Sequence, residues 1–225
     1  MNCKPPESFD NNIPRLPKSR FGTILADPPW RFSNRTGKMA PEHRRLNRYV
    51  TMSNEDIAKL PISELALPQS HLYLWVPNAL VSTGLAVMRE WGFEYKTNII
   101  WFKIRKDGGP DRRGVGFYFR NVTEMILFGV KGRLRTGPPG RRQPNIISTL
   151  KRGHSRKPDE LYEVIEACSP GPYLEIFARF KRSGWHQWGD QLELNGAHLK
   201  ARPECESVDP GVHRPQRAEI EMLFT

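Results

Sequence analysis

The feature that most constrains the fold is a short apolar run that ends in a rigid turn. Residues 23–26, Thr-Ile-Leu-Ala, are followed directly by Asp27, Pro28, Pro29 and Trp30. An apolar run of this length predicts a central strand that is covered on both faces, as in a parallel sheet. Proline fixes its own backbone and keeps the preceding residue extended, so Asp27 is expected at the carboxyl end of the strand. Ligands of open α/β sheets bind at that edge.

Strand and helix patterns alternate along the rest of the chain. Further strand patterns occupy residues 72–76, 98–102, 123–128 and 173–179, and residues 146–149 form a short apolar segment. Helix patterns occupy residues 54–60, 78–91 and 158–168. Ser53 and Asn78 are expected to cap the first two helices, and Pro158 suits the first turn of the third. The alternation predicts an α/β protein with a parallel sheet and right-handed crossovers. Three tryptophans are expected in its core: Trp75, Trp91 and Trp101.

Composition excludes several classes of protein. The 225 residues are 38% hydrophobic, and they contain no apolar run of membrane-spanning length and no signal-peptide pattern at the start, so a cytoplasmic protein is expected. Three widely spaced cysteines support neither a disulfide framework nor a Cys-x-x-Cys metal site, and no metal is expected. Among them, Cys168 is expected to be a small buried side chain. The length predicts one domain over residues 1–194, followed by a flexible or surface-docked tail over residues 195–225.

The charge indicates a polyanionic partner. The formal net charge is +11, and basic residues gather in three segments, residues 31–48, 103–120 and 131–142. The first segment leaves the Asp-Pro-Pro-Trp turn and is either a flap over a target base or a solvated surface loop. The other two are expected on one edge of the sheet, where they would wrap a nucleic-acid backbone.

The turn carries groups that suit an exocyclic amine. Such an amine is a poor nucleophile, because its lone pair is delocalised into the base. The Asp27 carboxylate and the Pro28 carbonyl can accept its two N–H bonds and favour the pyramidal geometry needed for attack on an electrophilic methyl group. Trp30 offers a flat face for stacking the base, a contact worth about 1 to 3 kcal/mol. The alternative is a plain Asp-Pro-Pro turn with an aromatic residue packed beneath it.

Two later charged residues stand beside predicted elements. Lys157 lies just before a helix, where it either meets a carboxylate or phosphate or is simply solvated. Glu175 lies inside an apolar strand, where an unpaired carboxylate is costly. A ribose diol would satisfy this carboxylate, and an ion pair with Arg179 is the alternative.

Motifs spread along the chain resemble those of one family, the MT-A70 adenine N6-methyltransferases. In chain order they are Ala-Asp-Pro-Pro-Trp, Leu-Tyr-Leu-Trp-Val, Ile-Ile-Trp-Phe-Lys, Phe-Gly-Val-Lys-Gly, Lys-Pro-Asp-Glu, Ser-Pro-Gly, Leu-Glu-Ile-Phe-Ala-Arg and Trp-Gly-Asp-Gln-Leu. They span residues 21–192. The resemblance implies S-adenosylmethionine as cofactor and a Rossmann-like methyltransferase fold in permuted order, with the catalytic motif before the cofactor-binding strand. The compact chain looks like bacterial or phage members, which are associated with DNA.

The resemblance also implies roles for individual residues. The catalytic motif would be Asp27, Pro28, Pro29 and Trp30. Cofactor contacts would come from Asp27, Lys157, Glu175, Arg179, Asp190 and Gln191. Substrate contacts would come from Tyr49, Glu124, Arg31, Arg112 and Arg113. One departure concerns the cofactor side: Phe180-Lys181-Arg182 replaces the Pro-His-Asn or related polar run of other members, which leaves the ribose and adenine contacts there open.

These residues support one leading hypothesis, transfer of a methyl group to the N6 amine of adenine in DNA. A duplex target would have to be flipped out of its stack, at a cost of a few kcal/mol. The same reaction on RNA is the alternative, since no motif reads a 2′-hydroxyl. A non-catalytic nucleic-acid-binding partner subunit is disfavoured by the intact motif, and a protein-glutamine methyltransferase by the tryptophan and the basic loops. A nucleic acid, no membrane, and a homodimer or related subunit are the expected partners.

Overall fold

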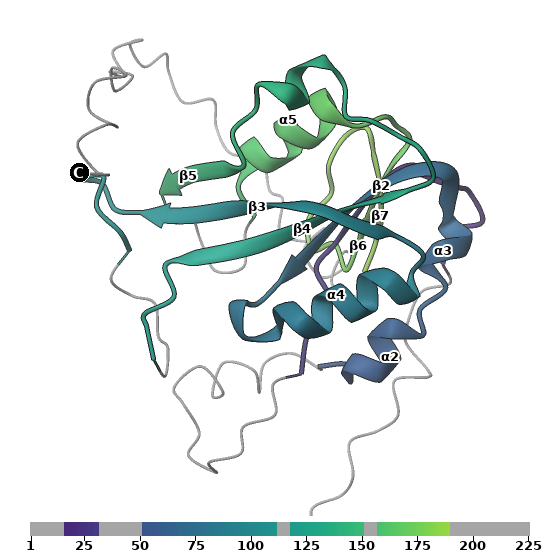
Figure 1. The fold of residues 1–225 in the computed structure, drawn as a ribbon, viewed down its shortest axis with the longest axis horizontal. Helices are drawn as coiled ribbons and strands as arrows, with labels where there is room; N and C mark the ends of the chain where they lie inside the picture. The colour runs from purple at the N-terminus through teal and green to yellow at the C-terminus, as the bar shows by residue number, and fades with distance from the viewer. Residues whose placement is uncertain (1–15, 32–50, 112–117, 151–156, 190–225) are drawn as a thin grey trace, which may run out of the picture.

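A computed structural model describes residues 16–31, 51–111, 118–150 and 157–189 (Figure 1). Within these ranges the chain forms one seven-stranded sheet in the order β5-β3-β4-β2-β1-β6-β7. The strands are β1 (Phe21–Ala26), β2 (Ala66–Val76), β3 (Glu94–Ile104), β4 (Thr123–Lys131), β5 (Ile146–Leu150), β6 (Tyr173–Ile176) and β7 (Trp185–Trp188). The helices are α2 (Asn54–Ala58), α3 (Ile62–Leu65), α4 (Val81–Glu90) and α5 (Asp159–Cys168), with 3-10 turns η2 (Asn78–Leu80) and η3 (Pro138–Arg141).

Strand β1 lies inside the sheet, as its apolar sequence predicts. All six of its residues are buried, and it pairs in parallel with β2 on one side and β6 on the other. Ile24 and Ala26 pack into the core that α2, α3 and α4 cover, whereas Leu25 packs into the core under α5. Figure 1 shows α4 and α5 on opposite faces of the sheet. This three-layer arrangement of helices around a mostly parallel sheet is Rossmann-like.

The expectation of a parallel sheet is wrong for one strand. β4 runs antiparallel to both of its neighbours, β2 and β3. The described part of the connection from β3 to β4 contains no helix. An antiparallel strand needs no helical crossover, whereas a parallel one does.

The reversal of β4 separates the two basic loops that were expected on one edge. The described residues 105–111 and 118–122 lie between the carboxyl end of β3 and the start of β4, at the same edge of the sheet as Asp27. Residues 132–145 begin at the opposite edge, after Lys131 pairs with Ser70 on β2, and end where Ile146 pairs with Ile100 on β3. The expectation that both loops share one edge is therefore wrong, because it depended on β4 running parallel to its neighbours.

Most of the local expectations are confirmed. The hydroxyl of Ser53 accepts a hydrogen bond from the backbone N–H of Asp56 and caps α2. The three tryptophans predicted in the core are 1 to 6% exposed, and Cys168 is buried at the end of α5. Asn78 does not cap a helix: it begins η2, and its side-chain amide donates to the backbone oxygen of Thr123 on the neighbouring strand. Pro158 is the N-cap of α5, one position before the helical turn expected for it.

Candidate active site

The Asp-Pro-Pro-Trp turn leaves β1 at the carboxyl edge of the sheet and is closed by its own backbone. The N–H of Trp30 donates to the carbonyl of Pro28 at 2.8 Å, and the N–H of Met52 donates to the carbonyl of Pro29 at 2.9 Å. The sequence suggested that the proline carbonyls are free acceptors, but each of them already accepts a backbone N–H. Because a carbonyl oxygen has two lone pairs, that of Pro28 retains one for a further donor.

Trp30 lies beneath the turn. Its side chain is 4% exposed, its indole N–H donates to the carbonyl of Trp75 at 2.9 Å, and it packs in the core with Met52. The expected exposed face for stacking a base is absent from this conformation. The observed contacts of Trp30 hold the turn, because the indole joins the loop after β1 to the end of β2.

Two carboxylates and one ammonium group meet beside the turn. β6 pairs with β1 so that Glu175 lies opposite Leu25, two residues before Asp27. Lys157, just before α5, places its Nζ 3.2 Å from Asp27 Oδ2 and 3.0 Å from Glu175 Oε1. The side chains of Lys157 and Glu175 are 8% and 3% exposed, whereas that of Asp27 is 27% exposed. Asp27 is therefore the member of this triad that faces outward.

Burial and the neighbouring carboxylates shift the pKa of Lys157 in opposite directions. Burial alone would lower the pKa of Lys157, but the carboxylates of Asp27 and Glu175 outweigh burial and raise the pKa above its ordinary value. The ammonium is therefore charged at neutral pH. It has three N–H bonds, and these two carboxylates engage two of them.

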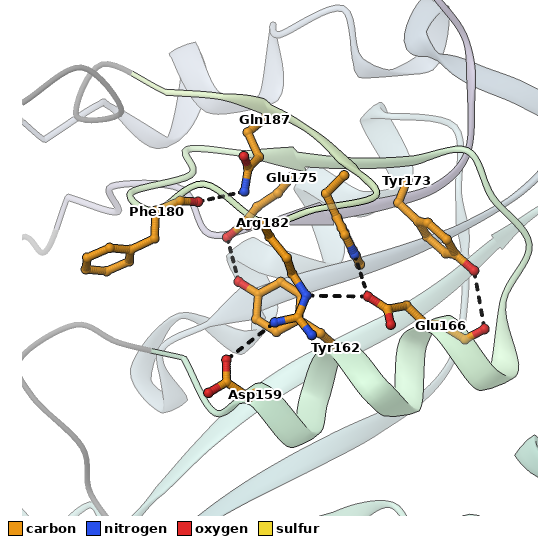
Figure 2. Close-up of polar contacts among 9 residues, drawn as sticks. Asp159, Tyr162, Glu166, Tyr173, Glu175, Phe180, Arg182 and Gln187 are labelled. Atoms are coloured by element: carbon orange, nitrogen blue, oxygen red, sulfur yellow. Dashed lines mark hydrogen bonds and ion pairs between the residues drawn. The ribbon is translucent and has the colours of Figure 1, made fainter. Parts of the chain in front are cut away.

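Glu175 has a second donor, which the sequence did not reveal. The phenol of Tyr162 donates to Glu175 Oε1 at 3.0 Å (Figure 2). Tyr162 follows Lys157 by five positions and comes from the first turn of α5. A tyrosine on the buried face of a helix normally predicts packing only. Its position close behind the Lys-Pro-Asp-Glu motif is the one signal that could have indicated this role.

A second polar group lies at the same edge, on β3 and β4. Glu124 accepts a hydrogen bond from the indole N–H of Trp75 at 2.7 Å and forms an ion pair with Lys103. The Nζ of Lys103 lies 4.7 Å from the ring centre of Trp101, and the Nζ of Lys157 lies 5.9 Å from that of Trp75. Trp75, expected only as a core residue, therefore stands between Glu124 and the Lys157 triad.

Of the other predicted site residues, two lie among the described residues and five do not. Arg31 is exposed directly after the turn. Arg179 is half-buried on the connection between β6 and β7. Five predicted site residues lie outside the described residues: Tyr49, Arg112, Arg113, Asp190 and Gln191. The flap segment after Trp30 and the tail over residues 195–225 also lie outside them, apart from Arg31.

In the described ranges, histidine, cysteine and carboxylate side chains form no group of three or more that could hold a metal ion. No helix in these ranges has the length and apolar character needed to cross a membrane.

The donor set of the triad fits the cofactor that the sequence implies. A buried carboxylate on a strand suits a pair of ribose hydroxyls, and an ammonium with one remaining N–H suits an amino-acid carboxylate. Both lie at the carboxyl edge of parallel strands, next to Asp27. The residues present can therefore hold S-adenosylmethionine.

Comparison with known proteins places this site in a family. The chain matches the family model MT-A70 over residues 21–191. It is 26% identical over 218 residues to the type II methyltransferase M.MunI of Mycoplasma sp, and the match covers 88% of this chain and 89% of that protein. It is 33% identical to a putative N(6)-adenosine-methyltransferase MT-A70-like protein of Medicago truncatula, covering 88% of this chain and 32% of that protein.

The human relative shows the same partial coverage. The chain is 32% identical over 187 residues to the N(6)-adenosine-methyltransferase catalytic subunit METTL3 of Homo sapiens, and the match covers 80% of this chain and 29% of that protein. The chain thus spans most of the length of M.MunI but only about a third of the plant and human relatives. The family model spans most of the chain, including all three residues of the triad. The chain therefore belongs to the MT-A70 family.

Proposed function

We propose that this protein transfers a methyl group from S-adenosylmethionine to the N6 amine of adenine in DNA. The observation that carries the proposal is the triad of Asp27, Lys157 and Glu175 at the carboxyl edge between β1 and β6. Family membership supports the reaction class, since the relatives include proteins named adenosine methyltransferases. We place DNA before RNA because similarity to a type II methyltransferase extends along most of both chains.

The chain's own residues would act by positioning. S-adenosylmethionine supplies an electrophilic methyl group on a sulfonium centre. Glu175 would accept hydrogen bonds from its ribose, and Lys157 would bind its carboxylate; Arg179, Asp190 and Gln191 are the further cofactor residues of the proposal. These contacts would bring the reacting groups together and need no covalent intermediate with the protein.

Asp27 would hold the acceptor amine. Its partly exposed carboxylate and the remaining lone pair of the Pro28 carbonyl can accept the two N–H bonds of the amine. The nitrogen lone pair is then directed at the methyl carbon. Pro29 fixes the turn, and Trp30 anchors it from below. Because Trp30 is buried, any base-stacking by its indole would require the turn to move.

Contacts to the nucleic acid would come from the same edge. Glu124 lies there beside Trp75, and Arg31 leaves the turn itself. Tyr49, Arg112 and Arg113 complete the proposed substrate residues. The same reaction on RNA is the second candidate, because the matched plant and human adenosine methyltransferases are 33% and 32% identical to the chain, against 26% for the type II enzyme.

Methyl transfer from labelled S-adenosylmethionine tests the proposal. Matched adenine-containing DNA and RNA are the acceptors, and N6-methyladenine is identified by mass spectrometry. Asp27→Asn keeps the size of the side chain but removes the charge. Glu90→Gln, an exposed carboxylate on α4, is the control. We expect transfer to DNA that falls at least a hundredfold in Asp27→Asn, in line with the loss of one preorganised electrostatic group.

The other outcomes separate the alternatives. Transfer to RNA alone would replace DNA by RNA as substrate. Cofactor binding without transfer to either acceptor would favour the partner-subunit hypothesis. Undiminished transfer by Asp27→Asn would refute the role of the Asp27 carboxylate.

A further inference from the structure

The connection from β6 to β7, residues 177–184, carries Arg179 and closes the cofactor side of the proposed site. It begins with Phe177 at a φ of 63°, a left-handed conformation that non-glycine residues seldom adopt. It is tied back to β7 by two hydrogen bonds, from Ala178 N to Trp188 O at 3.0 Å and from Gln187 Nε2 to Phe180 O at 2.6 Å. The connection therefore has a defined path that other contacts must support.

Arg182 attaches this connection to α5 (Figure 2). Its Nη1 lies 3.4 Å from Asp159 Oδ1, and its Nε lies 3.4 Å from Glu166 Oε1. Its guanidinium carbon lies 4.3 Å from the ring centre of Tyr162. Positions 159, 162 and 166 differ by three and four residues, so they share one face of the helix. The planar guanidinium is thus fixed over the aromatic ring and held at both ends.

Aromatic neighbours complete the setting of Tyr162. The edge of Trp185 meets the Tyr162 ring at a centroid distance of 5.3 Å, and the Trp185 indole N–H donates to Glu166 at 2.7 Å. Burial raises the pKa of Tyr162 far above its ordinary value, so the phenol keeps its proton and remains a donor. Its acceptor is Glu175 Oε1, the oxygen that also accepts from Lys157.

We propose that Tyr162 and Arg182 are positioning residues of the cofactor site. Tyr162 fixes one oxygen of the Glu175 carboxylate, so the second oxygen, which neither Tyr162 nor Lys157 engages, is oriented for a ribose diol. Arg182 fixes the ring of Tyr162. The proposal rests on the proposed function, because it takes Glu175 as the residue that meets the ribose.

Stability alone does not account for the contacts of Arg182. The side chain of Arg182 is 29% exposed, and those of its two acidic partners are 38% and 39% exposed. Ion pairs with this exposure contribute little to folding stability. The contact between Arg182 and Tyr162 differs from these ion pairs. It joins the partly exposed guanidinium to a buried phenol and, through that phenol, to Glu175.

The first experiment removes the phenol hydroxyl with Tyr162→Phe. The probes are S-adenosylhomocysteine and its 2′,3′-dideoxy analogue, which lacks the diol, and affinity is measured by calorimetry on the full chain. We expect the wild type to prefer the diol. In Tyr162→Phe, affinity for S-adenosylhomocysteine falls about tenfold, the size of one charge-assisted hydrogen bond. Affinity for the analogue stays the same, so the preference for the diol falls.

The second experiment changes Arg182. Arg182→Gln removes the charge, and Arg182→Lys keeps the charge but lacks the planar fork. We expect both to reduce the preference for the diol, and neither to reduce it further when Tyr162 is already phenylalanine. Arg89→Gln, an exposed arginine on α4, is the control and leaves the preference unchanged. Melting temperatures identify any variant that fails to fold, and Arg182→Lys then replaces Arg182→Gln.

The outcomes distinguish the two levels of the proposal. A wild type that binds no S-adenosylhomocysteine would overturn the proposed cofactor and this inference with it. A wild type that binds with a diol preference, and a Tyr162→Phe variant with the same preference, would overturn this inference alone. An equal loss of affinity for both probes would also overturn it, because the loss would then lie outside the contact between Glu175 and the ribose.

Discussion

Replacing Lys157 by methionine would leave two carboxylates together without their shared cation. At 3.0 Å and an effective dielectric constant of about 20, the attraction between Lys157 and Glu175 is about 5 kcal/mol before the cost of desolvation. Breaking a buried pair by removing one partner costs about 3 to 5 kcal/mol. Because Asp27 is 27% exposed and water screens it, we expect the low end for Lys157→Met, about 3 kcal/mol at pH 7.

The difference between the wild type and Lys157→Met should depend on pH. The two carboxylates raise the pKa of Lys157 above its ordinary 10.5 in the folded state. The ion pair therefore contributes its full stability below pH 10.5 and loses it as the pH rises through the folded pKa. The difference in the free energy of unfolding should therefore be smaller at pH 11 than at pH 7.

Urea unfolding at pH 5, 7 and 11 measures this difference. A loss of about 3 kcal/mol corresponds to a midpoint shift of about 1 to 3 M at the usual urea slopes of about 1 to 3 kcal/mol per molar. Lys59→Met, an exposed lysine just after α2, is the control and should change the midpoint little. An unchanged midpoint in Lys157→Met would refute the ion pair. A loss of equal size at all three pH values would refute the electrostatic reasoning, because only lost packing is independent of pH.

Two further substitutions test the surroundings of the triad. Glu124→Gln keeps an acceptor for Trp75 but removes the charge opposite Lys103; since the Glu124 side chain is 35% exposed, we expect about 1 kcal/mol of lost stability or less, and a larger, at least tenfold, loss of methyl transfer. His71→Gln removes a fully buried imidazole whose pKa burial lowers, so the free energy of unfolding of the wild type should fall more steeply than that of the variant as the pH drops below about 6.5.

For each of these two substitutions, one experimental outcome would contradict the prediction. For Glu124, thermal melting and methyl transfer are measured on the same sample, and unchanged transfer would remove this carboxylate from the acceptor side of the site. For His71, urea unfolding is compared at pH 7 and pH 5. The unfolded state binds more protons there than the folded state, so parallel pH profiles for the wild type and His71→Gln would show that His71 titrates normally.

The sequence predicted what local patterns encode. The strand before Asp27 is confirmed because an apolar run next to two prolines has few alternatives, and the cap at Ser53 is confirmed because the bonded atoms lie three residues apart. Glu175 was expected to need a partner, since a carboxylate inside an apolar strand is costly. Its partners were not predictable, because Lys157 and Tyr162 reach it only after α5 has packed on β6.

The errors about Pro28 and Asn78 both concern hydrogen-bond partners. The sequence presents the carbonyl of Pro28 as an available acceptor, but turn closure places the N–H of Trp30 against it. Asn78 has the residue type of a helix cap, but β4 begins beside it and takes its amide as a donor. In both cases the polar group already has a backbone partner that its residue type did not reveal. For Asn78 that partner comes from packing against β4, whereas for Pro28 it comes from the local closure of the turn.

The direction of β4 also limits how a nucleic acid can meet the protein. β4 has nine residues and spans about 27 Å, at about 3.4 Å per residue, between the edge that holds Asp27 and the edge where residues 132–145 begin. That distance corresponds to about eight base-pair steps of a duplex. Residues 132–145 therefore begin far from Asp27, and they return to its level along the strands only at their end, where Ile146 pairs with Ile100. Under the proposed function, Arg31 and the described residues 105–111 and 118–122 lie at the edge that would hold the target base, whereas the loop after β4 starts at the far edge of the sheet.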